Sequence, residues 1–328
     1  MKKKIELNKA FLVLLIIVIC VIATIINPRF ATQDNFVSIA RQISAPGILA
    51  VGMTFVLLTG GIDLSAGYGI TLGAIAMGLV YNYSNNPWLS MLGAIIACAI
   101  LGLLNGILIT QLNIVPFIAT LATMSITQGV LNIIALGSKF FLKNEVFAFI
   151  AVGELFNLKI LPISTLIFLL IFIMGVIILK HTKLGRYVYS IGSSEKNTAI
   201  AGINTEKYKM LVYIISGITM GIASIVMASR ISQVTQESGG NVYLMDAIAA
   251  AILGGTDISG GKGDIIGTLL GVIFLGIISN LLVFLSIPTI AQQFFKGIVI
   301  ILALVVNHIS GVLKEKEDLS SQSRSFIK

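Results

Sequence analysis

The chain has 328 residues, of which 56% are hydrophobic and only 11% are charged, and its mean hydropathy is +1.00. Because an ordinary soluble domain carries about 25% charged residues, this composition excludes one and predicts a protein whose solvent is lipid. The net charge of +8 lies mainly between apolar runs, so we attribute it to membrane topology rather than to nucleic-acid binding. Both cysteines, Cys20 and Cys98, lie in apolar runs and indicate neither a disulfide framework nor a metal site.

The apolar runs predict an all-α, polytopic bundle of about ten membrane-spanning helices. They are residues 10–26, 43–59, 67–82, 89–110, 115–136, 162–179, 211–229, 245–257, 265–285 and 290–307. The first run has no good cleavage site after it, so we interpret it as a retained helix rather than a signal peptide. The run 245–257 is too short to cross a bilayer core of about 30 Å, and we expect a half helix or a re-entrant helix there.

The distribution of Lys and Arg predicts that both termini are cytoplasmic. With an inside amino terminus, simple alternation of the runs places most of the 22 basic residues on the cytoplasmic side. The longest polar stretch, about residues 180–210, then becomes the largest cytoplasmic loop. We expect residues 1–307 to form one transmembrane domain and residues 308–328, rich in Ser, Lys and Glu, to form a disordered cytoplasmic tail.

A pattern GGxDxSxGxG occurs twice, at residues 60–69 and 254–263. Glycine-broken apolar segments that recur in two halves of a chain indicate internal duplication, and in transporters such breaks often lie near the pathway. The residues of interest are Gly60, Gly61, Asp63, Ser65, Gly254, Gly255, Asp257, Ser259, Gly261, Lys262 and Gly263. Simple alternation places both motifs on the cytoplasmic side, whereas an inverted repeat places them on opposite sides, and the sequence leaves this open.

Asp63 and Asp257 are the acidic residues that most suggest a function, because a carboxylate near hydrocarbon is costly. Each lies among glycines before a Ser, which favours capping of the following helix over proton coupling or gating. We also expect Asp246 to be an N-cap. The second motif is not a phosphate-binding loop, since Gly263 follows Lys262 where Ser or Thr is required. Several GxxxG spacings, such as Gly102 with Gly106 and Gly217 with Gly221, predict close helix packing.

Within the polar stretch, Ser193 or Ser194 is placed to cap a short helix that begins near Glu195, and Gly202 is placed to end it. Such a helix is a suitable attachment point for a cytoplasmic partner. A solvated connector that carries positive-inside charge explains the same composition, and from composition alone it is the favoured alternative.

At this point the chain resembles a known family. The segments 182–187, 195–204 and 246–263, together with the first glycine motif, resemble the permease subunit of ribose-type ABC importers. The resemblance implies a multi-pass protein of a bacterial inner membrane that forms a homodimer and works with a cytoplasmic ATPase and an extracytoplasmic sugar-binding protein. It also implies an ATPase-docking loop, whose residues here are Arg186, Glu195, Lys196, Asn197, Ala201 and Gly202. Lys196 and Asn197 replace two alanines that many importers carry, so particular contacts stay open.

Uncharged polar residues interrupt several apolar runs, where they suit either of two roles. Thr120, Thr123 and Thr127 share one helical face, with Gln128 nearby. Hydrogen bonds from such a lining suit a neutral sugar, but interhelical hydrogen bonds explain it equally well. The candidate pathway residues are Asn105, Thr120, Thr123, Thr127, Gln128 and Asn280.

The chain shows no catalytic grouping, no metal site and no cofactor motif, so we expect a transporter body that hydrolyses nothing itself. Its two histidines, His181 and His308, lie at the ends of apolar runs without Cys or Asp partners. Two alternatives stay open. One is a permease of the same family for a nucleoside or a furanosyl signalling molecule, and the other is an ion-coupled secondary transporter.

Overall fold

The computed structural model describes residues 2–135, 137–154, 161–288, 291–302 and 305, and most of this part is helical. Seven of its helices are long and apolar enough to cross a membrane. They are α1 (Lys2–Ile26), α2 (Gln33–Leu58), α4 (Pro87–Thr110), α5 (Pro116–Ile134), α7 (Ile163–His181), α10 (Thr205–Ile231) and α12 (Ile265–Phe284). The predicted polytopic helical bundle is confirmed. The predicted tail 308–328 lies outside the described residues.

The other three predicted runs also form helices. α3 (Ala66–Ser84) has 19 residues, and glycines and tyrosines lower its hydropathy. The helix Ala291–Leu302 covers the described part of the last run. α11 (Asn241–Leu253) has 13 residues and is therefore about 20 Å long, which is too short to span a bilayer core. The expected short helix is thus present, but it spans residues 241–253 instead of 245–257. It ends earlier than predicted because Gly254, the first residue of the second motif, is its C-cap.

Several short elements have no strong signal in the sequence. They are the 3-10 helix η1 (Pro28–Ala31), α6 (Glu145–Val152), α8 (Lys183–Ser193), β1 (Phe140–Phe141) and β2 (Gln233–Val234). The two strands pair antiparallel, with Phe140 opposite Val234. By contrast, α9 (Glu195–Ile200) forms as predicted, because the side chain of Ser194 accepts a hydrogen bond from the Asn197 amide and Gly202 follows with φ of +81°.

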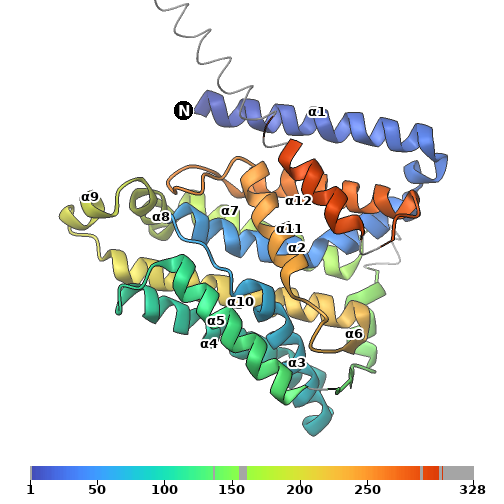
Figure 1. The fold of residues 1–328 in the computed structure, drawn as a ribbon, viewed down its shortest axis with the longest axis horizontal. Coiled ribbons are helices and arrows are strands. Elements are labelled where there is room, and N and C mark those ends of the chain that lie inside the picture. The colour runs from blue at the N-terminus through green and yellow to red at the C-terminus, as the bar shows by residue number, and fades with distance from the viewer. Residues whose placement is uncertain (1, 136, 155–160, 289–290, 303–304, 306–328) are drawn as a thin grey trace, which may run out of the picture.

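The bundle has two distinct ends (Figure 1). α8 and α9 lie at one end, which we call the α8–α9 end, and α6 lies at the other. The amino-terminal part of α1 belongs to the α8–α9 end, since Lys9 forms an ion pair with Asp264 just before α12. The hydroxyl of Tyr189 in α8 donates to the carbonyl oxygen of Gly263, next to Asp264, so α8 also lies beside the start of α12.

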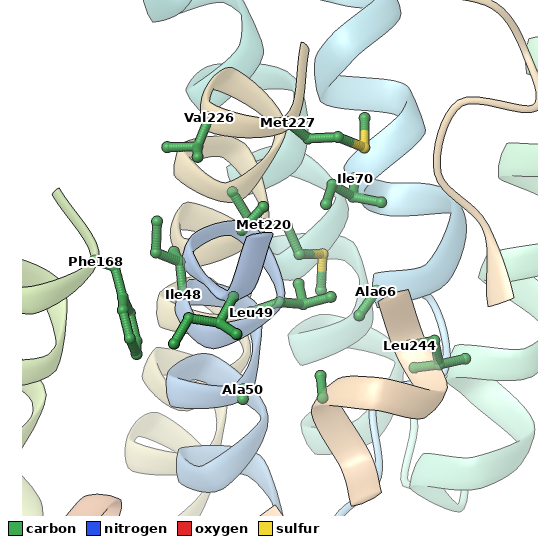
Figure 2. Packing of buried hydrophobic residues seen from close by; sticks show 14 of the residues in the cluster. Ile48, Leu49, Ala50, Ala66, Ile70, Phe168, Met220, Val226, Met227 and Leu244 are labelled. Atoms are coloured by element: carbon green, nitrogen blue, oxygen red, sulfur yellow. The ribbon is translucent and has the colours of Figure 1, made fainter. Parts of the chain in front are cut away.

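α2 is the central helix of the bundle. Residues 47–58 of α2 are all buried. Figure 2 shows Leu49 between Phe168 of α7 on one side and Ile70 of α3 and Leu244 of α11 on the other, with Met220 of α10 behind. These side chains are almost fully buried. Because α2 ends at the first glycine motif, this packing fixes the position of that motif.

The outer faces of α1, α4, α5 and α7 carry large apolar side chains. Leu14 is 57% exposed, Leu92 51%, Ile126 65% and Ile173 53%. Exposed apolar side chains on several long helices of one bundle are expected where lipid is the solvent. Several polar side chains of the same helices are buried inside the bundle instead, as Thr123 and Asn105 are.

α4 and α10 cross in contact because glycines face each other. A Cβ atom on Gly102 would lie 2.3 Å from the Tyr213 carbonyl oxygen, and one on Gly217 would lie 2.4 Å from the Cys98 carbonyl oxygen. A Cβ atom on Gly221 would lie 2.6 Å from a main-chain atom of the facing helix. The close packing predicted from the GxxxG spacings is therefore confirmed.

The substitution Gly217→Ala is expected to destabilise the fold by about 1–3 kcal/mol, because the added methyl group meets a main-chain oxygen that has no room to move. Thermal unfolding in detergent measures the loss. Gly129→Ala is the matched control, since a Cβ atom on Gly129 of α5 meets nothing within 4 Å. Equal stability of the two variants would contradict the close α4–α10 contact.

Candidate functional site

The two glycine motifs lie side by side at the α8–α9 end, together with the last residues of α8. We call this meeting point, residues 58–61, 192–193 and 259–263, the junction. The Gly261 amide donates to the Leu58 carbonyl oxygen at 2.9 Å, which joins the second motif to the end of α2. The motifs are therefore at the same end of the bundle, as simple alternation predicts, and not at opposite ends.

Only glycine fits at the centre of the junction. A Cβ atom on Gly192 of α8 would lie 1.9 Å from the Leu58 carbonyl oxygen and 2.3 Å from the Gly261 nitrogen. One on Gly260 would lie 2.7 Å from the Gly60 nitrogen. Three main-chain segments are thus in contact, so α8 cannot shift without moving the ends of α2 and of the second motif.

Tyr189 adds a side-chain link to this contact. Its hydroxyl donates to the Gly263 carbonyl oxygen at 2.9 Å. Burial and the nearby negative charge of Asp264 raise the pKa of Tyr189 to about 12. The phenol therefore stays protonated at neutral pH and keeps donating this hydrogen bond.

Asp63, in the first motif, is fully buried. One of its carboxylate oxygens accepts from the Ser65 amide at 3.1 Å and the Ser65 hydroxyl at 2.6 Å, and the other accepts from the Ser216 hydroxyl of α10 at 2.8 Å. Burial raises the pKa of Asp63 above its usual range, and the hydrogen bonds from Ser65 and Ser216 lower it in part. The carboxylate joins the start of α3 to α10, so it does more than cap one helix.

Asp257, at the equivalent place in the second motif, has a different environment. It accepts from the Ser259 amide at 3.0 Å and lies 3.7 Å from Lys262, and its side chain is 40% exposed. It does not cap α12, because that helix begins at Ile265 and its cap is Asp264, which accepts from the Gly267 amide at 2.7 Å. The expectation that Asp257 caps the following helix is therefore wrong.

The predicted docking residues form an exposed tip on α8 and α9. Thr198 holds α9 in place through its hydroxyl contact with Ser190 of α8 at 2.9 Å. Glu195 binds Lys209 of α10, whose Nζ lies 3.0 Å from both carboxylate oxygens. Around these anchors the side chains face outward, and Ile200 is 75% exposed. The exposed residues are Arg186, Glu195, Lys196, Asn197, Ala199, Ile200, Ala201 and Gly202.

Most of the candidate pathway residues bond one helix to another. Asn105 of α4 donates to the Ser65 hydroxyl at 2.8 Å and accepts from Thr123 of α5 at 2.6 Å. Thr120 donates to the Ile62 carbonyl oxygen at 3.0 Å. These bonds connect α4 and α5 to the first motif, which favours the interhelical role that the sequence left open.

The remaining candidate pathway residues are Asn280, Thr127 and Gln128. Asn280 of α12 exchanges two amide hydrogen bonds with Asn35 of α2, at 2.8 and 3.1 Å. Thr127 is buried and lines an apolar groove between α4 and α5 with Thr123. Gln128 is half-buried.

A cavity of mixed polar and apolar lining, which the sequence did not reveal, lies among α2, α10, α11, α12 and the helix 291–302. Its volume is about 220 Å³. Asp246 of α11 and Lys296 form an ion pair in its wall, with Nζ at 3.2 and 3.0 Å from the two carboxylate oxygens. Asp246 is thus in the interior of α11 and is not an N-cap. The cavity is lined by Gln42, Ile43, Pro46, Arg230, Val242, Tyr243, Asp246, Val272, Leu275, Gly276, Ser279, Gln292 and Lys296.

A family of permease components of branched-chain amino acid transport systems matches residues 35–304, which is most of the chain. The chain belongs to this permease family. The permease is 36% identical over 302 residues to the ribose import permease protein RbsC of Escherichia coli (strain K12), a match that covers 90% of this chain and 92% of the relative. It is 38% identical over 298 residues to RbsC of Bacillus subtilis (strain 168), with 90% and 91% covered.

A third relative is the L-arabinose transport system permease protein AraH of Escherichia coli (strain K12), with 30% identity over 288 residues that cover 88% of this chain and 87% of the relative. These relatives confirm the resemblance to ribose-type permeases that the motifs indicated. The permease is therefore a multi-pass membrane protein.

In the permease, Asp63→Asn is expected to lower stability by about 1–3 kcal/mol, since the buried carboxylate loses charge-assisted hydrogen bonds to two helices. Asp257→Asn, the matched change in the second motif, is expected to stay within about 0.5 kcal/mol of the wild type, because its carboxylate is partly exposed and weakly paired. Thermal unfolding of the two variants in the same detergent measures both. Similar losses in the two would show that the burial of Asp63 has no energetic consequence.

Proposed function

We propose that this permease is the transmembrane subunit of an ATP-binding-cassette importer and that it carries a ribose-like monosaccharide into a bacterial cell. Relatives named for ribose are 36% and 38% identical over 90% of the chain, and a relative named for L-arabinose is 30% identical over 88%. The family description refers to branched-chain amino acids, whereas the relatives named for sugars match this chain over nearly its full length. A nucleoside or furanosyl signalling molecule is the alternative cargo.

The observation that carries the ATPase-driven mechanism is the contact between α8 and both glycine motifs. The tip of α8 and α9 projects an exposed apolar side chain, Ile200, among charged and polar neighbours. Such a surface suits a protein partner, since the apolar centre drives association and the charged rim sets orientation. A push on this tip reaches the junction directly, because Gly192 at the end of α8 is in contact with Leu58 and Gly261.

The charge distribution supports a cytoplasmic α8–α9 end. Basic side chains surround α8 and α9 along the chain, and they are Lys180, Lys183, Arg186, Lys196, Lys207 and Lys209. An excess of Lys and Arg is typical of cytoplasmic loops. The α6 end then faces outward, where an extracytoplasmic sugar-binding protein would deliver its cargo.

In this arrangement the permease forms a homodimer and works with cytoplasmic ATPase subunits. ATP binding brings the ATPases together, and the movement passes through α8 and α9 to the junction. The helices α2, α3, α11 and α12, which end or begin close to the junction, then change the side of the membrane from which the pathway is accessible. The permease itself supplies the pathway for the solute and transmits the movement, and ATP is hydrolysed on the partner.

Glu195→Lys is expected to lower co-purification of the ATPase and uptake by about tenfold or more, since it places a cation beside Lys209 and detaches α9 from α10. The measurement is the amount of ATPase retained on the tagged permease, with uptake of labelled ribose in cells. Glu145→Lys is the matched control, because Glu145 is likewise exposed in the first turn of a short helix but lies at the α6 end. Unchanged ATPase binding by Glu195→Lys would contradict docking at α9.

Reconstituted alone in liposomes, the permease is expected to be unable to concentrate ribose, because ATP hydrolysis by the partner subunit supplies the energy for uptake. Reconstitution with the ATPase, the binding protein and ATP is expected to give accumulation. Counting labelled sugar in the liposomes measures both. Accumulation by the permease alone, driven by a proton or sodium gradient, would establish the ion-coupled alternative instead.

A further inference from the structure

The cavity among α2, α11 and α12 lies beside a gap in the main-chain hydrogen bonding of α2. Pro46 lies inside α2 and has no N–H group, so it cannot donate to the carbonyl group of Gln42, four residues earlier. Both residues line the cavity. In a membrane such a carbonyl group is tolerated where it faces a water-filled or ligand-filled space. The break in the hydrogen bonding of α2 therefore coincides with the cavity.

The cavity also contains an ion pair in the middle of apolar helices. The side chains of Asp246 and Lys296 are 18% and 13% exposed. Neither residue caps a helix, since Asp246 lies within α11 and Lys296 within the helix 291–302. Charged side chains inside a membrane bundle are costly, and in transporters they mark the substrate path.

The cavity has two kinds of wall, which fit the two kinds of surface on a sugar. Ile43, Val272 and Leu275 are apolar and suit the C–H face of a sugar ring. The second kind of wall carries hydroxyl, amide and charged groups, which suit the hydroxyl groups of the sugar. The residues that carry these groups are Gln42, Arg230, Tyr243, Asp246, Ser279, Gln292 and Lys296.

The size of the cavity favours a small solute. Its volume of about 220 Å³ is below the roughly 300–1,000 Å³ of sites for drug-sized ligands. One monosaccharide is therefore a better match than a larger solute. A carboxylate accepts from two adjacent hydroxyl groups, and an ammonium group donates to a hydroxyl oxygen, so the Asp246–Lys296 pair is suited to a vicinal diol.

α11 connects this cavity to the junction. Asp246 and Tyr243 lie in its first half, and the helix ends at Leu253, directly before the second motif. α11 is also fixed to α12 by main-chain contact, since a Cβ atom on Gly271 would lie 2.1 Å from the Ala250 carbonyl oxygen and one on Gly267 would lie 1.9 Å from the Gly254 carbonyl oxygen. A movement of the junction therefore moves one wall of the cavity.

We propose that this cavity is the solute-binding site of the pathway, where the Asp246–Lys296 pair binds the hydroxyl groups of one neutral monosaccharide. The proposal rests on the proposed function and adds the site and its ligand chemistry. α11 then has two tasks, since it contributes groups that contact the sugar and it transmits the state of the junction to them.

The test is uptake of labelled D-ribose by proteoliposomes that contain the permease, the ATPase and the binding protein. Asp246→Asn and the doubly neutral variant Asp246→Asn with Lys296→Gln are compared with the wild type. The double variant creates no new unpaired charge and keeps polar groups of similar size, so a purely structural ion pair is replaced with little loss. We expect both variants to lose uptake by about tenfold to a hundredfold, as charge-assisted hydrogen bonds to the sugar are lost.

The ATPase rate, stimulated by the sugar-loaded binding protein, is measured in the same samples. We expect it to be retained in both variants, because docking and the junction are intact. Asp34→Asn is the matched control, an identical change at an exposed position in the first turn of α2, and we expect wild-type uptake. Wild-type uptake and an unchanged KM for ribose in the double variant would overturn the proposed site. A wild-type complex that fails to accumulate any sugar would instead contradict the proposed function.

A second measurement does not depend on the ion pair. In a Cys20→Ser background, where Cys98 is fully buried, Ser279→Cys places a thiol in the cavity wall. We expect a small thiol reagent to label it and ribose at saturating concentration to slow the labelling. Ser44→Cys, a buried position outside the cavity lining, is expected to stay unlabelled. Labelling of Ser279→Cys at an unchanged rate with ribose present would also overturn the proposal.

Discussion

Direct contact between main chains is the constraint on which the rest of this structure depends. In lipid, helices gain no hydrophobic energy from packing against each other, so their association relies on close van der Waals contact and polar bonds. Here glycine supplies the contact at three places, where α4 crosses α10, where α11 lies on α12, and where α8 meets both motifs. Only a residue without a side chain permits these approaches, and each one fixes elements that are distant in sequence.

The polar groups inside the bundle follow from that close packing. Once α4, α3 and α10 are in contact, a buried carboxylate such as Asp63 has to find donors on neighbouring elements, and Ser65, Ser216 and Asn105 provide them. The second copy of the motif lies at the surface of the same junction, and there Asp257 keeps its charge exposed beside Lys262. One sequence pattern therefore has two physical roles, and burial decides between them.

In the arrangement that we propose, the permease receives force from its partner at one place and binds solute at another. The junction is built almost entirely from main-chain contacts and transmits movement without specific recognition. The cavity is built from side chains of varied chemistry and suits recognition of a small polar solute. α11 lines the cavity and ends at Leu253, directly before the second motif, so it links the two places.

The sequence by itself determined the membrane class, the family and the ten helical runs, because hydropathy and length are local properties that the bilayer imposes on each segment separately. It also predicted a serine cap for α9, at Ser193 or Ser194, and the close packing at the glycine spacings, which are local too. It did not determine which aspartate would be buried, since Asp63 and Asp257 have nearly identical neighbours in the chain. Nor did it reveal the pairing of Asp246 with Lys296, 50 residues apart in sequence. Only the tertiary structure decided these, because the energy of a charge or a polar group depends on the segments that folding brings around it, and no local pattern records them.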